Sequence, residues 1–328
     1  MAEFYTRRTV VIPGSTPAPN EPSCRHNLAL PLRLSVHDYH VRDADESGLT
    51  LILTHGTSFN KYFWELIINS LLSESDFRSS VKRLIAIDAA NHGDSAVLNR
   101  DVLPQKPFWP DDSRDILHTL KYFGVQQPVI GIGHSFGGGA MCHAAMMDPG
   151  AFWATIFIEP ILFQMKGQTD VVAQMALRRR DKWDSKADLA TAFQKSKGLQ
   201  DWDKRQLDVY VEHGTIPIGE DNESSPRTLK TPKEQEAGTY LAAPHPEILE
   251  LLSQSRGEHH FVWGADSKVV SAPDRESVSR MMRPPSTSQV MSGAGHLIPM
   301  THPDTLTTIL HDLVGSIPQY EPPAQARL

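Results

Sequence analysis

Ser135 lies in the segment Gly133-His134-Ser135-Phe136-Gly137, which has the spacing G-x-S-x-G. This spacing predicts a sharp turn between a strand and a helix, with the serine at its tip. Side chains two residues before and after the serine would collide with neighbouring backbone, so Gly133 and Gly137 are the residues that fit. The turn would expose the Ser135 hydroxyl as a nucleophile. A phosphate-binding loop is disfavoured, because neither a Walker lysine nor a G-x-G-x-x-G spacing is present.

A serine nucleophile needs a base to take its proton and an acid to orient that base. His296 is the candidate base, because it follows a predicted strand in the segment SGAGHLIP and precedes a helix. Two carboxylates compete as the acid. Glu159 ends the apolar run TIFIEP, where an unpaired buried charge would be costly. Asp266 lies one residue before the acid position of a G-x-x-D pattern, which Ser267 occupies. The residues favour Glu159 and keep Asp266 as its rival.

Two backbone amides are needed to hold the oxyanion that forms when a serine attacks a carbonyl. Phe136 N–H directly follows the nucleophile and begins a predicted helix, whose dipole adds to the effect. Thr57 N–H is the second candidate, because the segment LTHGTSFN places it just after a predicted strand. The hydroxyl of Ser58 and the ring of His134, which flank these groups, are candidate substrate contacts.

Short apolar runs alternate with helical spacing along most of the chain. The runs LTLILTHG, VKRLIAIDA, QPVIGIGHS and FWATIFIEP predict buried parallel strands, and RLSVHDYHV predicts an antiparallel one. Helices are predicted at about 61–76, 109–124 and 137–148, so the pattern indicates a doubly wound α/β sheet. We expect residues 1–160 to form the first part of a core domain. Residues 161–250 form a polar, helix-rich cap, residues 251–318 complete the core, and residues 319–328 form a tail.

Composition narrows the classes of protein further. The 328 residues include 40% hydrophobic and 22% charged residues, which is typical of a soluble globular protein. A formal charge of −7 argues against a nucleic-acid partner. The two cysteines have no metal-ligand spacing, and no cofactor fingerprint is present, so we expect neither a metal nor a cofactor. Because no run of 18 apolar residues occurs, we expect no membrane span.

The last three residues, Ala326-Arg327-Leu328, have the small-basic-Leu pattern that the peroxisomal import receptor binds. The preceding segment YEPPAQ contains prolines and would present them as a flexible tail. The N-terminal segment lacks the apolar stretch of a secretory signal. We therefore expect this receptor as a partner and a peroxisomal location, with the cytoplasm as the alternative.

With the segments HG, D-x-x-N-H-G-x-S, GHSFGG and GAGH in order, the chain resembles the α/β-hydrolase superfamily over roughly 45–160 and 255–316. The segments GHSFGGG, IEPI, RRRDKW and TPKEQEAGTY with the terminal ARL resemble, more narrowly, fungal peroxisomal serine hydrolases, a group of lipases, toxin-biosynthesis hydrolases and acyl-CoA hydrolases. The resemblance implies an α/β-hydrolase fold. Its mostly parallel sheet has eight strands, and a helical cap is inserted after the sixth. In the acyl-CoA hydrolases the acid follows the sixth strand, which corresponds to Glu159.

The resemblance also implies hydrolysis of a small-molecule ester or acyl-CoA thioester. Arg178 and Arg179 would then contact CoA phosphates, because guanidinium groups suit phosphate, and a solvated helix face is the alternative. Two other functions stay open, a carbon-carbon bond hydrolase and a non-catalytic ligand-binding member of the fold. The sequence also leaves open whether the chain forms a homodimer.

Overall fold

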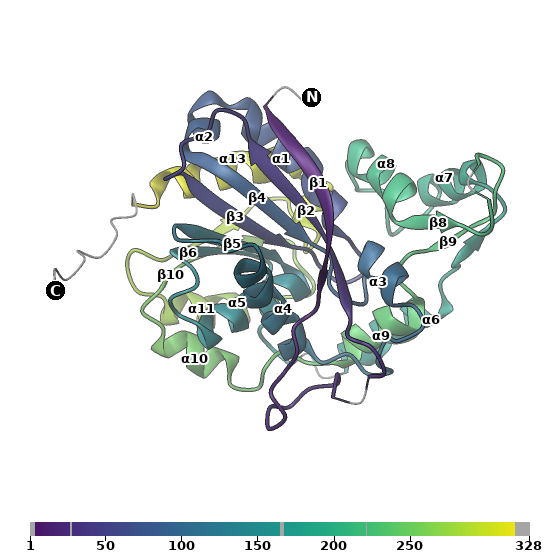
Figure 1. Ribbon diagram of the computed structural model, residues 1–328, viewed down its shortest axis with the longest axis horizontal. Helices are drawn as coiled ribbons and strands as arrows, with labels where there is room; N and C mark the ends of the chain where they lie inside the picture. The colour runs from purple at the N-terminus through teal and green to yellow at the C-terminus, as the bar shows by residue number, and fades with distance from the viewer. Residues whose placement is uncertain (1–3, 27, 165–166, 221, 319–328) are drawn as a thin grey trace.

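The computed structural model describes residues 4–26, 28–164, 167–220 and 222–318. An eight-stranded sheet with helices on both faces forms its centre (Figure 1). The strands lie in the order β1-β2-β4-β3-β5-β6-β10-β11. Their bounds are β1 (Tyr5–Pro13), β2 (Arg33–Val41), β3 (Leu49–Thr54), β4 (Val81–Ile87), β5 (Val129–His134), β6 (Ala154–Ile158), β10 (Glu258–Gly264) and β11 (Thr287–Met291).

The pairing of these strands confirms the predicted, mostly parallel sheet. β2 runs antiparallel to β1 and β4, and all other neighbours are parallel. The central strands are apolar throughout because both of their faces are covered. In β3, Leu51 and Leu53 pack into the apolar cluster on one face and Ile52 into the cluster on the other. β1 was not among the predicted strands, because most of its residues are exposed and it has no apolar run.

Helices form one layer on each face of the sheet. One layer contains α1 (Glu65–Ser73), α2 (Ser75–Ser80) and α13 (Pro303–Ser316). The other contains α4 (Trp109–Tyr122), α5 (Ser135–Met147), α10 (Ile248–Gln254) and α11 (Ala272–Met281). The predicted helices near 109–124 and 137–148 are thus confirmed. The helix predicted at 61–76 is divided. A 3-10 turn, η1 (Lys61–Trp64), leads directly into α1, and Glu74, whose backbone is extended, separates α1 from α2.

The chain leaves the core layers between β6 and α10, and we call this segment the cap. It contains α6 (Gln168–Arg178), β7 (Lys182–Trp183), α7 (Lys186–Gln194), α8 (Lys204–His213), β8 (Thr215–Pro217), β9 (Arg227–Leu229) and α9 (Lys233–Leu241). The strands pair as a small antiparallel sheet, β7-β9-β8, that the sequence did not predict because each is only two or three residues long. Ile248 and Leu252 of α10 pack into the core, so the cap ends before the predicted boundary at 250.

An apolar cluster joins the cap to the core. It combines Trp183, Phe193 and Trp202 of the cap with Phe59 and Phe63, which follow β3. The short helix α12 (Ile298–Thr301) contacts both η1 and α8 at the same junction, and α3 (Gly93–Asn99) lies against β2. The cap is therefore attached next to the loop that follows β3.

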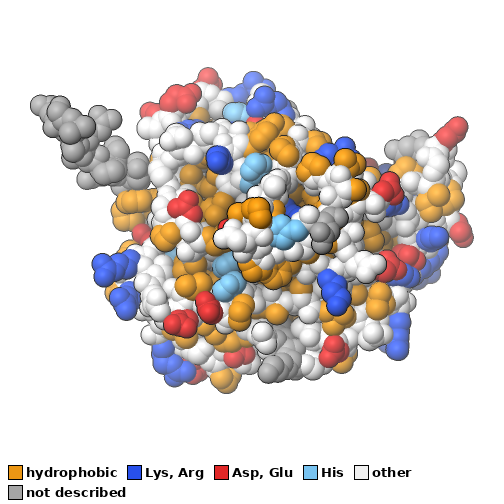
Figure 2. Space-filling view, turned by 60° about the horizontal axis from the view of Figure 1, so that its bottom comes forward, with side chains coloured by type: hydrophobic (Ala, Val, Ile, Leu, Met, Phe, Trp, Pro, Cys, Tyr) orange, Lys and Arg blue, Asp and Glu red, His pale blue; other side chains and the backbone are white. Residues whose placement is uncertain are grey.

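Two further expectations concern surfaces and ends. Within the described ranges, no helix has the length and apolar character needed to cross a membrane. Figure 2 shows cationic and anionic side chains interspersed on one face, with hydrophobic side chains between them. Ala326, Arg327 and Leu328 lie outside the described residues, as does all of the predicted tail 319–328.

The buried His37 predicts that the free energy of unfolding falls in mild acid. Burial, with the nearby Lys61 cation, lowers the pKa of the fully buried His37 to about 2. An unfolded histidine titrates near 6.5, so below that pH the unfolded chain binds a proton that the folded chain does not. The free energy of unfolding should therefore fall with decreasing pH, by at most about 1.4 kcal/mol per pH unit for this residue.

Urea unfolding at pH 7.5, 6.5 and 5.5 tests this slope. His37→Gln should make it shallower. His311→Gln is the control of opposite sign, because hydrogen bonding to Asp76 raises the pKa of His311 and its removal should make the slope steeper. An unchanged slope in His37→Gln would contradict the prediction.

Candidate active site

The turn between β5 and α5 places Ser135 at its tip. Ser135 has φ 54°, a left-handed conformation that costs a residue other than glycine about 1–3 kcal/mol. A Cβ at Gly133 would lie 2.7 Å from both the Gly137 carbonyl oxygen and Gly138 Cα, and one at Gly137 would collide with the His55 carbonyl oxygen. The glycines predicted from the spacing are therefore the residues that allow this close approach.

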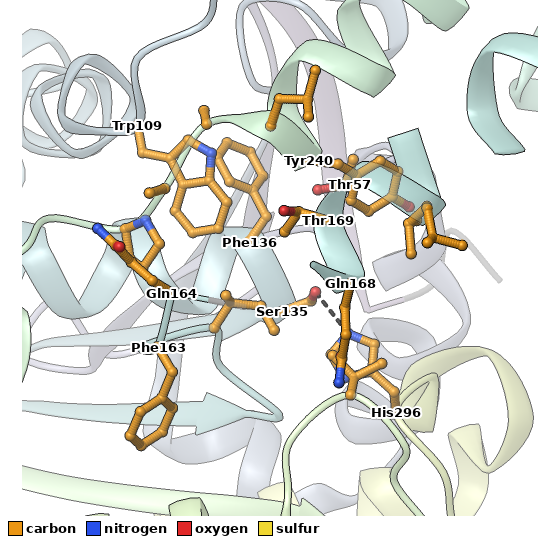
Figure 3. Close-up of a pocket in the computed structure, with 18 of the residues that line it drawn as sticks. Thr57, Trp109, Ser135, Phe136, Phe163, Gln164, Gln168, Thr169, Tyr240 and His296 are labelled. Carbon is orange, nitrogen blue, oxygen red and sulfur yellow. Dashed lines mark hydrogen bonds between the residues drawn. The ribbon is translucent and has the colours of Figure 1, made fainter. Parts of the chain in front are cut away.

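The structure brings Ser135, His296 and Glu159 into one line. Ser135 Oγ lies 2.8 Å from His296 Nε2, the contact drawn as a dashed line in Figure 3. His296 Nδ1 lies 2.9 Å from Glu159 Oε2. A carboxylate can only accept, so Nδ1–H donates to Glu159, and Nε2 is left to accept the Ser135 hydroxyl proton. This is the arrangement in which an imidazole can act as the base for a serine.

Glu159 is held by three donors although it is fully buried. Besides His296, Gly264 N–H donates to Oε1 at 2.7 Å and the Ser267 hydroxyl donates to Oε2 at 2.6 Å. Glu159 has φ 48° and stands at the end of β6, so its backbone is strained like that of Ser135. Hydrogen bonds to the charged form are what make a buried carboxylate tolerable.

Asp266, the rival acid, is exposed, and its carboxylate is beyond ion-pair distance of His296. The position of the expected acid is taken by Ser267, which supports the carboxylate of Glu159. The sequence analysis placed Ser267 at that position but gave it no role. The sequence held a signal that the acid had moved from this position to the end of the sixth strand. The signal was a serine in the G-x-x-D position together with Glu159 directly after the sixth strand.

Thr57 and Phe136 lie beside Ser135, and no hydrogen bond from either N–H is formed within the described residues. His55 Nε2 accepts from Ala89 N–H at 3.1 Å, so its Nδ1–H donates to the Gly56 carbonyl oxygen at 2.8 Å. In a trans peptide the N–H points opposite to the C=O, so Thr57 N–H is turned away from His55. Phe136 N–H belongs to the first turn of α5 and has no partner within that helix. Both residues line the same cavity as Ser135.

His134 turns away from the cavity and does not line it. Its Nε2–H donates to the carbonyl oxygen of His296 at 3.0 Å. Burial, with the neighbouring His296, lowers the pKa of His134 to about 3, so the ring is neutral at physiological pH. Instead of contacting substrate as predicted, His134 supports the loop that carries His296.

A cavity of about 740 Å³ opens in front of Ser135. Its walls come from the core and from α6 and α9 of the cap, and Figure 3 shows aromatic rings around Ser135. The aromatic lining residues are Phe59, Trp109, Phe136, Phe163 and Tyr240. Trp109 is fixed by its indole N–H, which donates to the Thr239 carbonyl oxygen. An apolar cavity of this size suits a bulky hydrophobic group.

The other predicted substrate contacts lie outside this cavity. The Ser58 hydroxyl donates to Glu236 Oε1 at 2.6 Å. Arg179 is paired with the same carboxylate at 3.0 Å, so it is engaged inside the protein rather than free for phosphate. Arg178 is exposed at the end of α6. Of all side chains lining the cavity in the described part of the chain, only Lys268 is a lysine or arginine, and the sequence analysis did not select it.

A model described as the alpha/beta hydrolase family matches residues 51–308. The chain belongs to the alpha/beta hydrolase family. The fold and the resemblance predicted from the sequence are thereby confirmed. Among the residues that the structure describes, no group of three His, Cys, Asp or Glu side chains could hold a metal ion.

Curated relatives of this hydrolase come from fungi. The type I acyl-CoA thioesterase mpaH of Penicillium brevicompactum is 26% identical over 263 residues, which cover 71% of this chain and 60% of that protein. The peroxisomal membrane protein LPX1 of Saccharomyces cerevisiae is 31% identical over 131 residues, 38% of this chain and 34% of that protein. The chain thus matches at most about 60% of the length of these relatives.

A solved structure shares the fold. The peroxisomal alpha-beta-hydrolase Lpx1 of Saccharomyces cerevisiae superimposes with a TM-score of 0.82 and 21% identity, over 97% of this chain and 92% of that chain. The E-2-(acetamidomethylene)succinate hydrolase superimposes with a TM-score of 0.67 and 16% identity, over 94% and 100%. At these identities the likeness shows the fold alone.

Replacing each of the two carboxylates by its amide, one at a time, tests which of them orients His296. Glu159→Gln should lower kcat for ester hydrolysis about 10⁴-fold, because an amide favours the wrong histidine tautomer. Asp266→Asn should leave kcat within about twofold, because its exposed carboxylate makes no ion pair with the ring. Steady-state kinetics with p-nitrophenyl butyrate measures both. A larger loss in Asp266→Asn than in Glu159→Gln would reverse the assignment.

Proposed function

We propose that this α/β hydrolase cleaves a carboxylic ester or acyl-CoA thioester through an acyl-enzyme on Ser135. The line of hydrogen bonds from Ser135 through His296 to the buried Glu159, at the floor of an apolar cavity, carries the proposal. A serine is a weak nucleophile by itself, and this arrangement supplies the base and the orienting acid that it needs.

In the first half of the reaction Ser135 Oγ attacks the acyl carbonyl carbon while its proton passes to His296 Nε2. The carbonyl electron pair moves onto the oxygen, which the amides of Thr57 and Phe136 hold. When the tetrahedral intermediate collapses, the bond to the leaving sulfur or oxygen breaks, and His296 gives its proton to the leaving group. Glu159 stabilises the imidazolium that forms in between.

Water completes the cycle. It attacks the acyl-serine and gives one proton to His296, and the second tetrahedral intermediate then expels Ser135, which recovers that proton. The products are a carboxylic acid and the free enzyme. The largely apolar walls lower the local dielectric, which strengthens the hydrogen bonds to the oxyanion.

The finer part of the proposal is an acyl-CoA with a bulky hydrophobic acyl group. The aromatic cavity suits such an acyl group, and the name of the mpaH relative describes an acyl-CoA thioesterase. Lys268, exposed on the loop after β10, would meet the anionic end of CoA at the mouth of the cavity. A peroxisomal location belongs to the same proposal, and the names of the LPX1 relatives support it.

Release of free thiol from a panel of acyl-CoAs, run beside matched p-nitrophenyl esters, tests the proposed reaction. We expect turnover of medium or bulky acyl-CoAs to exceed that of the oxygen esters. Ser135→Ala should lower kcat by at least about 10³-fold on both, because it removes the nucleophile. Faster turnover of oxygen esters would indicate a carboxylesterase, and no turnover of either would contradict the proposal.

Reversal of the charge at the cavity mouth separates the two substrate classes. Lys268→Glu should raise KM for an acyl-CoA about 5- to 10-fold at low salt, and less at high salt, because exposed charge pairs are worth about 1 kcal/mol. KM for the matched p-nitrophenyl ester, which has no phosphates, should not change. Equal effects on both substrates would argue against a role in CoA binding.

A further inference from the structure

The loop that carries Thr57 is hydrogen-bonded to the cap through its next residue. The hydroxyl of Ser58 lies 2.6 Å from Glu236 Oε1 and 3.1 Å from the Tyr240 hydroxyl, both on α9. Figure 3 shows Tyr240 beside Thr57 at the edge of the cavity. The residue that follows the candidate oxyanion amide is therefore in direct contact with a helix 178 residues away in sequence.

Glu236 is the centre of this contact. Its side chain is 4% exposed, and its Oε1 accepts a hydrogen bond from the Arg179 guanidinium at 3.1 Å; the same nitrogen lies at ion-pair distance, 3.0 Å, from Oε2. Arg179 also donates to the Tyr210 hydroxyl at 3.2 Å. A buried carboxylate that loses a partner is strongly destabilised. Glu236 therefore holds Ser58 and Arg179 together, and with them the β3 loop, α9 and the end of α6.

The directions of these hydrogen bonds are determined by the chemistry of the groups. A carboxylate only accepts, so the Ser58 O–H donates to Glu236 and the Tyr240 O–H donates to Ser58 Oγ. Burial raises the pKa of Tyr240, so its proton is present at neutral pH. The Ser58 hydroxyl is thus engaged as donor and as acceptor within the protein.

The backbone of Ser58 shows that this engagement shapes the loop. Ser58 has φ 76°, a conformation that a residue other than glycine keeps only where its surroundings impose it. On the Gly56 side, the ring of His55 holds the carbonyl oxygen of Gly56. On the Ser58 side, Glu236 and Tyr240 hold the hydroxyl. The amide of Thr57 lies between these two restraints.

We propose that Ser58, Glu236 and Tyr240 are positioning residues that couple the place of α9 to the orientation of the Thr57 N–H. Tyr240 and Leu241 of the same helix also line the acyl cavity. An acyl group that reaches Tyr240 and Leu241 therefore contacts α9, the helix that positions the Thr57 amide. The binding energy of the acyl group then stabilises the transition state and raises kcat. This inference rests on the proposed function.

Two mild variants test the coupling. Ser58→Gly suits the positive φ and removes the CH2OH side chain that contacts Glu236 and Tyr240, and Tyr240→Phe keeps the ring that lines the cavity. Glu234→Gln is the matched control, because Glu234 is exposed on the same helix. For each we would measure kcat and KM with p-nitrophenyl acetate and p-nitrophenyl octanoate, and count active sites by fluorophosphonate labelling.

We expect Ser58→Gly to lower kcat per labelled site about 10- to 100-fold with the octanoyl ester, because misplacing an oxyanion donor costs up to about 10²-fold. KM should stay within about twofold. The ratio of kcat for octanoyl to acetyl ester should fall toward one, and Tyr240→Phe should change it in the same direction. Glu234→Gln should behave like the wild type.

Loss of labelled sites with unchanged kcat per site would show a merely structural role and overturn the inference. Unchanged kcat values and an unchanged octanoyl-to-acetyl ratio of kcat in both variants would also overturn the inference. The proposed function would then still stand. If the wild-type protein neither hydrolyses the esters nor reacts with the fluorophosphonate, the proposed function and the coupling are both overturned. This result differs from failure of the coupling alone, in which the wild type is active.

Discussion

The buried carboxylate of Glu159 is the constraint on which the site depends. It directly follows β6 and has no contact with solvent, so it needs hydrogen-bond donors from the protein. All three donors, Gly264, Ser267 and His296, come from chain that follows the cap. The two parts of the core are thus joined at the same carboxylate that orients His296, and the insertion of the cap leaves this junction intact.

Two strained residues stand side by side at the ends of neighbouring strands. Ser135 follows β5 and Glu159 follows β6, and both have positive φ. Close packing offsets the cost, because Gly133 and Gly137 bring β3, β5 and α5 together, and the Thr54 hydroxyl donates to the Gly137 carbonyl oxygen at 2.9 Å. Ser135 and Glu159 therefore stand at the ends of packed strands, whereas loops supply His296 and Thr57.

The cap adds the parts of the site that the core lacks. It closes an apolar cavity over Ser135 and contributes a second buried carboxylate, Glu236, which contacts the loop after β3. Glu159 is hydrogen-bonded to His296, and Glu236 is hydrogen-bonded to Ser58, the residue after Thr57. In the coupling proposed above, the binding of an acyl group and the positioning of the Thr57 amide both use α9.

Local patterns in the sequence determined the sheet, the serine turn and His296, because each depends on residues adjacent in the chain. Glycine spacing defines the turn, and apolar runs define strands whatever lies far away. The sequence favoured Glu159 over Asp266, but only the tertiary structure put one of them against His296. It also decided the partners of Ser58 and Arg179, which a pattern of neighbouring residues cannot contain. The small cap sheet has strands too short to leave a periodic signal, so pairing between distant segments alone reveals it.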